Sequence, residues 1–139
     1  MKTRVLVPLA ALLACLVIAA PASAAVTGNF SGETSQDLGL DEPYTTDIVF
    51  SILNGRMVTV VAEVRMQCGP AEIQDVRVLK SYKTGTGPKL SNGGGFAFTV
   101  QGAHISGTIG KKSGSGSIRA SKGGCSGDGK WKVSYVKGT

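Results

Sequence analysis

Few residues in this sequence have side chains whose chemistry could support a reaction. Its 139 residues include three cysteines and one histidine, His104. A Ser-His-Asp triad would need that histidine, and the sequence contains no Gly-x-Ser-x-Gly elbow. It also lacks a His-Glu-x-x-His or Cys-x-x-Cys pair, the familiar signatures of zinc sites. We therefore expect no cofactor and no metal, and interpret His104 as a solvated or packed strand residue.

Carboxylates supply the best argument for an enzyme. Five of them fall within fifteen residues: Glu33, Asp37, Asp41, Glu42 and Asp47. Two carboxyl groups held about 5–10 Å apart could serve as the acid and base of a glycan hydrolase. We favour a solvated acidic loop, and keep a weak glycan hydrolase as a minor alternative.

A glycine-rich segment invites comparison with phosphate-binding loops. Residues 124–130, GCSGDGK, have the glycine spacing of such a loop. The next residue is Trp131, where a serine or threonine should hold magnesium. A strand is expected to follow, so no helix N-terminus would face the phosphate. We therefore expect no nucleotide to bind.

Charge is distributed unevenly along the chain. Residues 25–75 contain eight acidic and two basic residues, whereas residues 76–139 contain eleven basic and one acidic residue, Asp128. Acidic strands that pair beside basic ones would cancel this asymmetry. A basic face would instead attract polyanions. The candidates for such a face are Lys111, Lys112, Arg119, Lys122, Lys130, Lys132 and Lys137.

The N-terminal 24 residues are typical of a secretory signal peptide. Lys2 and Arg4 precede a long uncharged apolar run, which leads to an A-x-A site ending at Ala24. The apolar run is shorter than the about 20 residues of a membrane-spanning helix. We expect cleavage after Ala24, leaving a single secreted domain over residues 25–139 with no transmembrane segment.

The roles predicted for the three cysteines depend on whether the signal peptide is removed. Cys15 ends a Leu-Leu-Ala-Cys run, so lipidation at Cys15 is a minor alternative to cleavage after the A-x-A site. Removal of the signal peptide leaves Cys68 and Cys125 in an oxidising compartment, where a disulfide between them is the default. The alternative is a free nucleophilic thiol, which would need His104 as its base.

Alternating apolar and polar residues, bounded by glycine-rich turns, predict an all-β fold. The strongest pattern is a hairpin with strands over 45–53 and 56–67. Asn54-Gly55 joins them, because both residues tolerate the positive φ of a two-residue turn. We expect about eight short antiparallel strands in a β-sandwich or a closed β-barrel. The other strands are expected over 26–34, 71–82, 96–100 and 104–109, around Ile118, and over 130–135.

The segment over 71–95 is less regular. Alternation breaks at Asp75, which predicts a bulge or two short pieces within the strand over 71–82. Residues 83–95 read as a flexible loop, rich in glycine. The residues expected to be buried in this strand are Ile73, Val76, Val78 and Leu79.

The last strand has two faces of different character. Trp131, Val133 and Tyr135 alternate with Lys130 and Lys132. The aromatic residues Trp131, Tyr135, Tyr82 and Tyr44 could form a platform for sugars. Trp131 and Tyr135 share a face with Val133, however, which favours core packing. We expect the aromatic face to pack inward and the lysines to project outward.

The C-terminal part resembles the ends of many small secreted bacterial proteins, of the actinobacterial type, in its runs GFAFTVQGAHISGTIG, SGSGSIRAS and CSGDGKWKVSY. GNFSGET near the start and NGRMVTVVAEVRMQC in mid-chain fit the same layout. The resemblance covers most of residues 25–139. It implies a β fold with one disulfide and implies no particular activity.

These features favour a secreted, non-enzymatic β domain. We expect it to bind a polyanionic or wall-associated partner, such as an anionic cell-wall polymer or glycan, through the basic C-terminal face. The alternative is an inhibitor of a secreted hydrolase that presents the loop over 83–95 to the enzyme.

Overall fold

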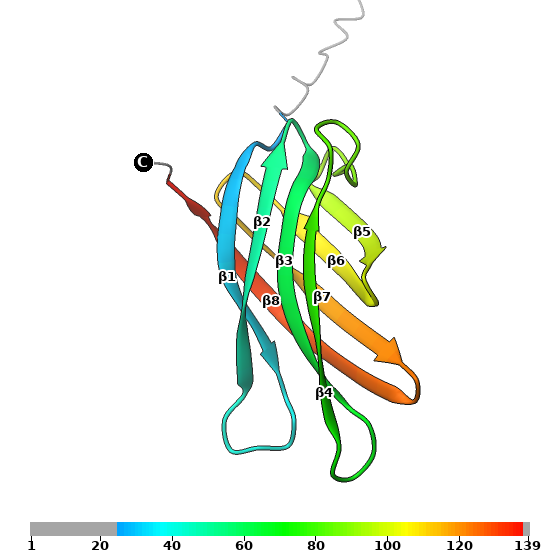
Figure 1. The fold of residues 1–139 in the computed structure, drawn as a ribbon. Coiled ribbons are helices and arrows are strands. Elements are labelled where there is room, and N and C mark those ends of the chain that lie inside the picture. The colour runs from blue at the N-terminus through cyan, green and yellow to red at the C-terminus, as the bar shows by residue number, and fades with distance from the viewer. Residues whose placement is uncertain (1–24, 138–139) are drawn as a thin grey trace, which may run out of the picture.

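The computed structural model describes residues 25–137, and its regular structure is entirely β. Eight antiparallel strands form one sheet in the order β4-β3-β2-β1-β8-β7-β6-β5 (Figure 1). This confirms the expected all-β class. The strands are β1 (Gly28–Gln36), β2 (Tyr44–Leu53), β3 (Arg56–Gln67), β4 (Ile73–Ser81), β5 (Gly95–Val100), β6 (Ala103–Ile109), β7 (Ser113–Lys122) and β8 (Cys125–Val136).

The N-terminal predictions cannot be compared with this fold. The expected signal peptide over 1–24, with Cys15, lies outside the described residues. Within residues 25–137 the structure has no helix long and apolar enough to cross a membrane.

Each half of the chain forms a four-stranded meander, β1–β4 and β5–β8. The two meanders join where the first strand pairs with the last, with Asn29 opposite Val136 and Ser35 opposite Lys130. The sheet folds over near this junction, so that β1–β4 lie as a layer in front of β5–β8 in Figure 1. The buried side chains gather between the two layers.

Two-residue turns connect several strands. Asn54 and Gly55 have φ values of 50° and 75°, and they join β2 to β3 as predicted. Gln101 and Gly102 repeat this geometry between β5 and β6, with φ of 47° and 85°. Positive φ at both positions gives the turn a twist that matches that of the flanking strands.

Trp131 on β8 lies at the centre of the core and is 1% exposed. Its ring centroid lies 5.0 Å from that of Phe50 and 5.8 Å from that of Phe96. Gly116 on β7 is directly opposite Trp131, and a Cβ at this glycine would lie 2.6 Å from Cζ2 of the indole. The indole Nε1 donates a hydrogen bond to the carbonyl oxygen of Ser117, at 3.2 Å. Glycine at position 116 therefore makes room for the ring.

The last strand departs from expectation at its end. Trp131 and Val133 are buried as predicted, but Tyr135 is 46% exposed. Pairing with β7 ends at Ser134, so no β7 side chain covers Tyr135, whose backbone N–H donates to Lys112 O before that strand begins. Its ring instead contacts Phe30 edge-on, with centroids 5.7 Å apart. The expectation that Tyr135 would be buried is wrong for this reason.

The prediction for the strand over 71–82, which corresponds to β4, also needs correction. β4 is continuous, and its register with β3 shows no shift at Asp75. That register turns Val76 and Val78 inward and the odd-numbered residues outward, so Ile73 and Leu79 are 58% and 59% exposed. The register shift in this layer lies between β2 and β3, at Ser51 and the residue after it.

The segment between β4 and β5, expected to be a flexible loop, is anchored to the β2–β3 hairpin. Met57 N donates to Pro88 O at 2.9 Å, and Leu90 N donates to Gly55 O at 2.7 Å. Leu90 is also buried. The middle of this segment is therefore held against the body of the domain, while residues 83–86 and 91–93 on either side of it are exposed.

Side chains fill a gap where β2 separates from β3. Pairing of these strands is confined to the end nearest their turn, so backbone groups farther along β3 lack a strand partner on that side. Gln36 accepts from Arg65 N at 2.8 Å and donates to Arg65 O at 2.9 Å, while Thr46 Oγ1 donates to Glu63 O at 2.9 Å. These side chains replace the missing ladder, as buried backbone groups require.

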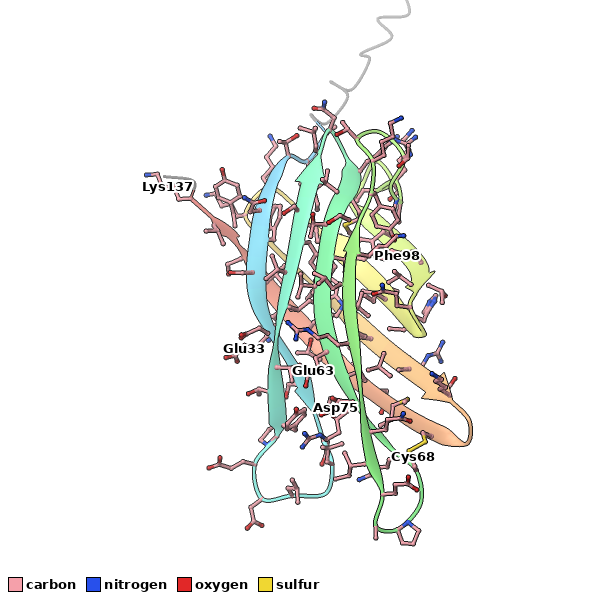
Figure 2. All side chains as sticks on the ribbon, in the orientation of Figure 1. Glu33, Glu63, Cys68, Asp75, Phe98 and Lys137 are labelled. Atoms are coloured by element: carbon pink, nitrogen blue, oxygen red, sulfur yellow. A yellow bond between two sulfur atoms is a disulfide. The ribbon has the colours of Figure 1, made fainter. Side chains whose placement is uncertain are left out.

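The same end of β3 is fastened to β8. Gln67 pairs with Ser126, and the next residue, Cys68, forms a disulfide with Cys125 (Figure 2). Gln36 adds a hydrogen bond to Asp128 O at 3.2 Å. The predicted disulfide is confirmed, and it joins the two layers of the folded sheet.

Candidate functional site

The outward face of the β7–β8 hairpin carries the two lysines expected to project from the last strand. Lys130 and Lys132 are exposed, because they alternate with the buried Trp131 and Val133. Lys130 has Ser117 as its neighbour on β7, and Lys132 has Ser115. On the β7 side the neighbours of both lysines are small serines, so nothing bulky covers the lysines from that strand.

The other five predicted basic residues lie along the same hairpin. Lys111 and Lys112 precede β7, and Tyr135 N donates to Lys112 O at 2.8 Å, which brings them to the end of β8. Lys137 follows the end of β8 (Figure 2). Arg119 lies outward on β7, and Lys122 ends that strand beside the opposite turn. We call these seven basic residues the basic stripe. Four of them, Lys111, Arg119, Lys130 and Lys132, have the outward register of the hairpin. Lys112, Lys122 and Lys137 are exposed at its two ends, at positions with the register of the inner face, so the stripe is extended rather than a compact cluster.

Two acidic residues lie directly across from members of the basic stripe on neighbouring strands. Glu33 on β1 is opposite Lys132, and Asp128 on β8 is opposite Arg119. Within residues 25–137 the single ion pair, with nitrogen and oxygen within 4.0 Å, is that between Arg65 and Asp75 on the other layer. The stripe is therefore partly balanced by nearby acids, although none of them forms an ion pair with it among the described residues.

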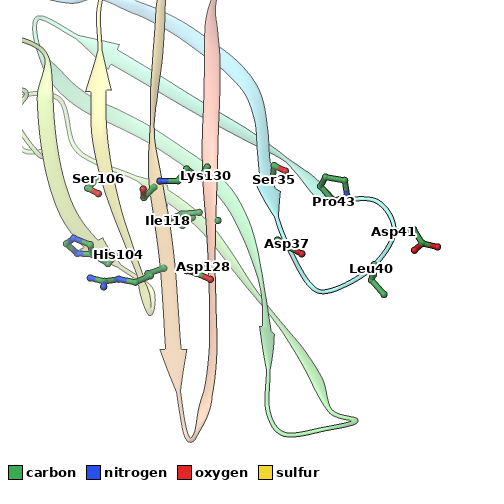
Figure 3. Close-up of a pocket in the computed structure, with 13 residues that line it drawn as sticks. Ser35, Asp37, Leu40, Asp41, Pro43, His104, Ser106, Ile118, Asp128 and Lys130 are labelled. Atoms are coloured by element: carbon green, nitrogen blue, oxygen red, sulfur yellow. The ribbon is translucent and has the colours of Figure 1, made fainter.

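A groove lies beside the stripe, between the β1–β2 loop and the outward faces of β6, β7 and β8 (Figure 3). Its volume is about 760 Å³, and a second hollow of about 850 Å³ continues it toward the β5–β6 turn. Four residues line both hollows: Asp37, His104, Arg119 and Asp128. The exposed Leu40 and Pro43 add apolar surface at the lip.

The groove collects residues whose proximity the sequence analysis missed. His104, Arg119 and Asp128 occupy one cross-strand row over β6, β7 and β8. His104 Nδ1 lies 3.1 Å from Thr99 Oγ1, which orients the imidazole from β5. The sequence shows only that these three residues take outward positions on separate strands. That they are neighbours follows from the strand register, which the sequence does not give.

The five clustered carboxylates do not all come together. Glu33 and Asp47 are opposite each other on the outer face of β1 and β2, whereas Asp37 and Asp41 line the groove. Glu42 is exposed in the β1–β2 loop. The acidic cluster in sequence is thus divided between two surfaces.

A second polar cluster occupies the outer face of the other layer. The Arg65 guanidinium lies 3.9 Å from the Tyr44 ring centroid and donates to both carboxylate oxygens of Asp75, at 2.9 and 3.2 Å. The hydrogen bond from Arg65 holds the pKa of Asp75 below its ordinary value of 3.8. Desolvation raises the pKa of Tyr44 above 10.0 against the opposing charge of Arg65. The polar groups of this cluster thus find their partners within it.

In comparisons with known proteins, no family model, curated protein or solved structure matches the chain.

Proposed function

We propose that this protein is a secreted, non-enzymatic binding domain for an anionic polymer, either a cell-wall polymer or an acidic glycan. The observation that carries the proposal is the basic stripe, in which seven cationic side chains follow one β hairpin. Within the described part of the chain, no acidic side chain forms an ion pair with any of them. Such a surface attracts polyanions and raises their local concentration.

The shape of the stripe favours a polymer over a small anion. β8 is 12 residues long, which corresponds to about 40 Å of strand. The basic residues are spread over this length, and serines lie between them. A long chain with repeated negative groups can contact several of these cations at once, and its hydroxyl groups can hydrogen-bond to the serines.

Single-stranded nucleic acid is a weaker fit to this surface. Proteins that bind single strands without sequence preference stack the bases on exposed aromatic rings between their basic residues. Trp131 is 1% exposed, and Tyr135 lies at the far end of β8. The middle of the stripe therefore offers hydroxyl and ammonium groups but no stacking platform.

Chromatography on an immobilised sulfated polysaccharide, eluted with a salt gradient, tests the proposal. The informative variant is Lys130→Ser with Lys132→Ser, because both side chains point outward from the centre of the stripe. The matched control is Lys83→Ser with Lys89→Ser, which removes the same charge from exposed positions between β4 and β5. We expect the first variant to elute at clearly lower salt than the native protein, and the control to elute close to it.

Two outcomes would contradict the proposal. Elution of the native protein with neutral proteins at low salt would show that the stripe does not hold polyanions. Equal shifts of both double variants would show that net charge alone governs retention, without a defined surface. Repeating the experiment with isolated cell-wall polymer distinguishes the two classes of ligand.

A further inference from the structure

β4 is an end strand of the sheet, and one of its long sides has no strand partner within residues 25–137. Four consecutive outward-facing residues along it are exposed: Ile73, Asp75, Arg77 and Leu79. Exposed end strands offer unpaired N–H and C=O groups to another strand, and proteins usually protect them. Here two large apolar side chains instead accompany the open backbone.

One hydrogen bond shows which residues of β4 direct their backbone N–H and C=O groups toward the open edge. In an antiparallel pair, successive residues direct their backbone groups alternately toward the partner and away from it. Leu79 N donates to the side-chain Oε1 of Gln101 at 2.8 Å, so this N–H points away from β3. Residues 73, 75 and 77 share its parity. Their N–H and C=O groups therefore also face the open edge.

The edge is complementary to itself about Val76. If two copies of β4 pair antiparallel with a two-fold axis at this residue, Asp75 lies opposite Arg77 of the other copy, and Ile73 lies opposite Leu79. The backbone N–H and C=O groups of all four residues face the open edge. Each facing pair can therefore form two backbone hydrogen bonds. Opposite charges and apolar pairs directly across strands are the favourable combinations.

Neighbouring centres of symmetry are unfavourable. An axis at Asp75 places the two Asp75 carboxylates opposite each other, and an axis at Arg77 places the two Arg77 side chains opposite each other. Like charges directly across strands destabilise a pair. The charges of the strand therefore disfavour these two registers, and the axis at Val76 is the one that places Asp75 opposite Arg77.

The charges of β3 extend this pattern. Glu63 is the cross-strand neighbour of Arg77, and Arg65 is the neighbour and ion-pair partner of Asp75. In the proposed dimer, one row of outward side chains crosses four strands. It runs from Glu63 and Arg77 of one copy to Asp75 and Arg65 of the other copy. The signs alternate along the whole row. On the inner face, the half-buried Val76 meets its own counterpart and extends the core.

We propose that β4 is a homodimer interface, at which two copies of this chain pair their β4 strands antiparallel about Val76. Gln101 limits the association, because its amide occupies the edge N–H of Leu79 and must move aside for the outermost pairs. The dimer is therefore weak and depends on concentration, with the Asp75–Arg77 contacts at its centre.

Sedimentation of the intact, disulfide-bonded protein over concentrations up to about 1 mM tests the interface. We expect the native protein to dimerise. Arg77→Asp and Asp75→Lys should each raise the dimer dissociation constant at least about tenfold, because each places like charges across the edge. Lys122→Asp, which makes the same change of charge as Arg77→Asp but in the other layer, should leave association unchanged.

A mixture of the two variants gives the decisive result. In a heterodimer of Asp75→Lys with Arg77→Asp, every facing pair at positions 75 and 77 again combines opposite charges. We expect this mixture to dimerise although each variant alone does not. Gln101→Gly, which tolerates the positive φ of the turn and removes the amide, should strengthen the native dimer severalfold.

The native protein remaining monomeric at all concentrations would overturn the proposal. So would an unimpaired dimer of Arg77→Asp, a mixture that stays monomeric, or a weaker dimer of Gln101→Gly. These measurements contain no polyanion, so they stand or fall independently of the proposed binding function.

Discussion

Thr34 provides the sharpest test of the packing described above. It is fully buried on β1, and its Oγ1 is the one buried side-chain polar atom without a hydrogen-bond partner among residues 25–137. A buried hydroxyl without a partner costs about 1–3 kcal/mol of desolvation. Valine has nearly the same shape and an equally good propensity for strands. We therefore expect Thr34→Val to increase the free energy of unfolding by about 1 kcal/mol.

The residue directly across the strand pair supplies a matched control. Thr46 is the cross-strand partner of Thr34, but its Oγ1 donates to Glu63 O at 2.9 Å. Thr46→Val removes the same atom and leaves this carbonyl without its donor, so we expect a loss of about 1–2 kcal/mol. The two substitutions are chemically identical and should have opposite signs.

Denaturant unfolding followed by tryptophan fluorescence measures both changes, because the protein contains a single tryptophan, the buried Trp131. The disulfide must stay oxidised so that both variants share one unfolded state. A loss of stability in Thr34→Val similar to that in Thr46→Val would refute the reasoning. It would mean that the Thr34 hydroxyl has a partner, such as a buried water molecule.

Three further predictions follow from the fold. Replacing Cys68 and Cys125 by alanine should lower stability by about 4 kcal/mol, the chain-entropy value for a separation of 57 residues, as measured by denaturant unfolding. Gly116→Ala should cost more than about 2 kcal/mol and change the near-UV circular dichroism of the tryptophan, because a Cβ there enters the space of the indole. NMR titration should give Asp75 a pKa below 3.8, and Arg65→Gln should return it toward that value.

The controls for these predictions come from the same structure. Gly110→Ala should be nearly neutral, because a Cβ there would meet only Ser113 O, at 3.7 Å. For Asp75 the folded pKa lies below the unfolded one, so the ion pair stabilises the protein above the unfolded pKa and is lost as the pH falls through the folded value. An unshifted Asp75 pKa, or a harmless Gly116→Ala, would contradict the described contacts.

Local signals in the sequence were sufficient for several elements. Asn54-Gly55 specifies its hairpin because both residues tolerate positive φ, and the structure has them at 50° and 75°. Alternation around Trp131 and Val133 identifies the buried face of β8, which also places Lys130 outward. These features depend on neighbours within a few residues.

Features that depend on residues far away in the chain could not be predicted from the sequence pattern. Ile73 and Leu79 are apolar, but the register with β3 turns them outward. Tyr135 continues an inward pattern, but β7 has already ended at its position. The groove needs His104, from β6, to meet Asp128, from β8, and only the strand order brings them together.

The pairing of β1 with β8 has a consequence for chain connectivity. If the residues next to Gly28 and Val136 were linked by a short turn, and new ends were opened between β4 and β5, the strand order along the chain would become β5-β6-β7-β8-β1-β2-β3-β4. Every sheet neighbour in that series would then be joined by a single hairpin. The native protein is thus a circularly permuted meander, and restoring the uninterrupted order should lower contact order and speed folding.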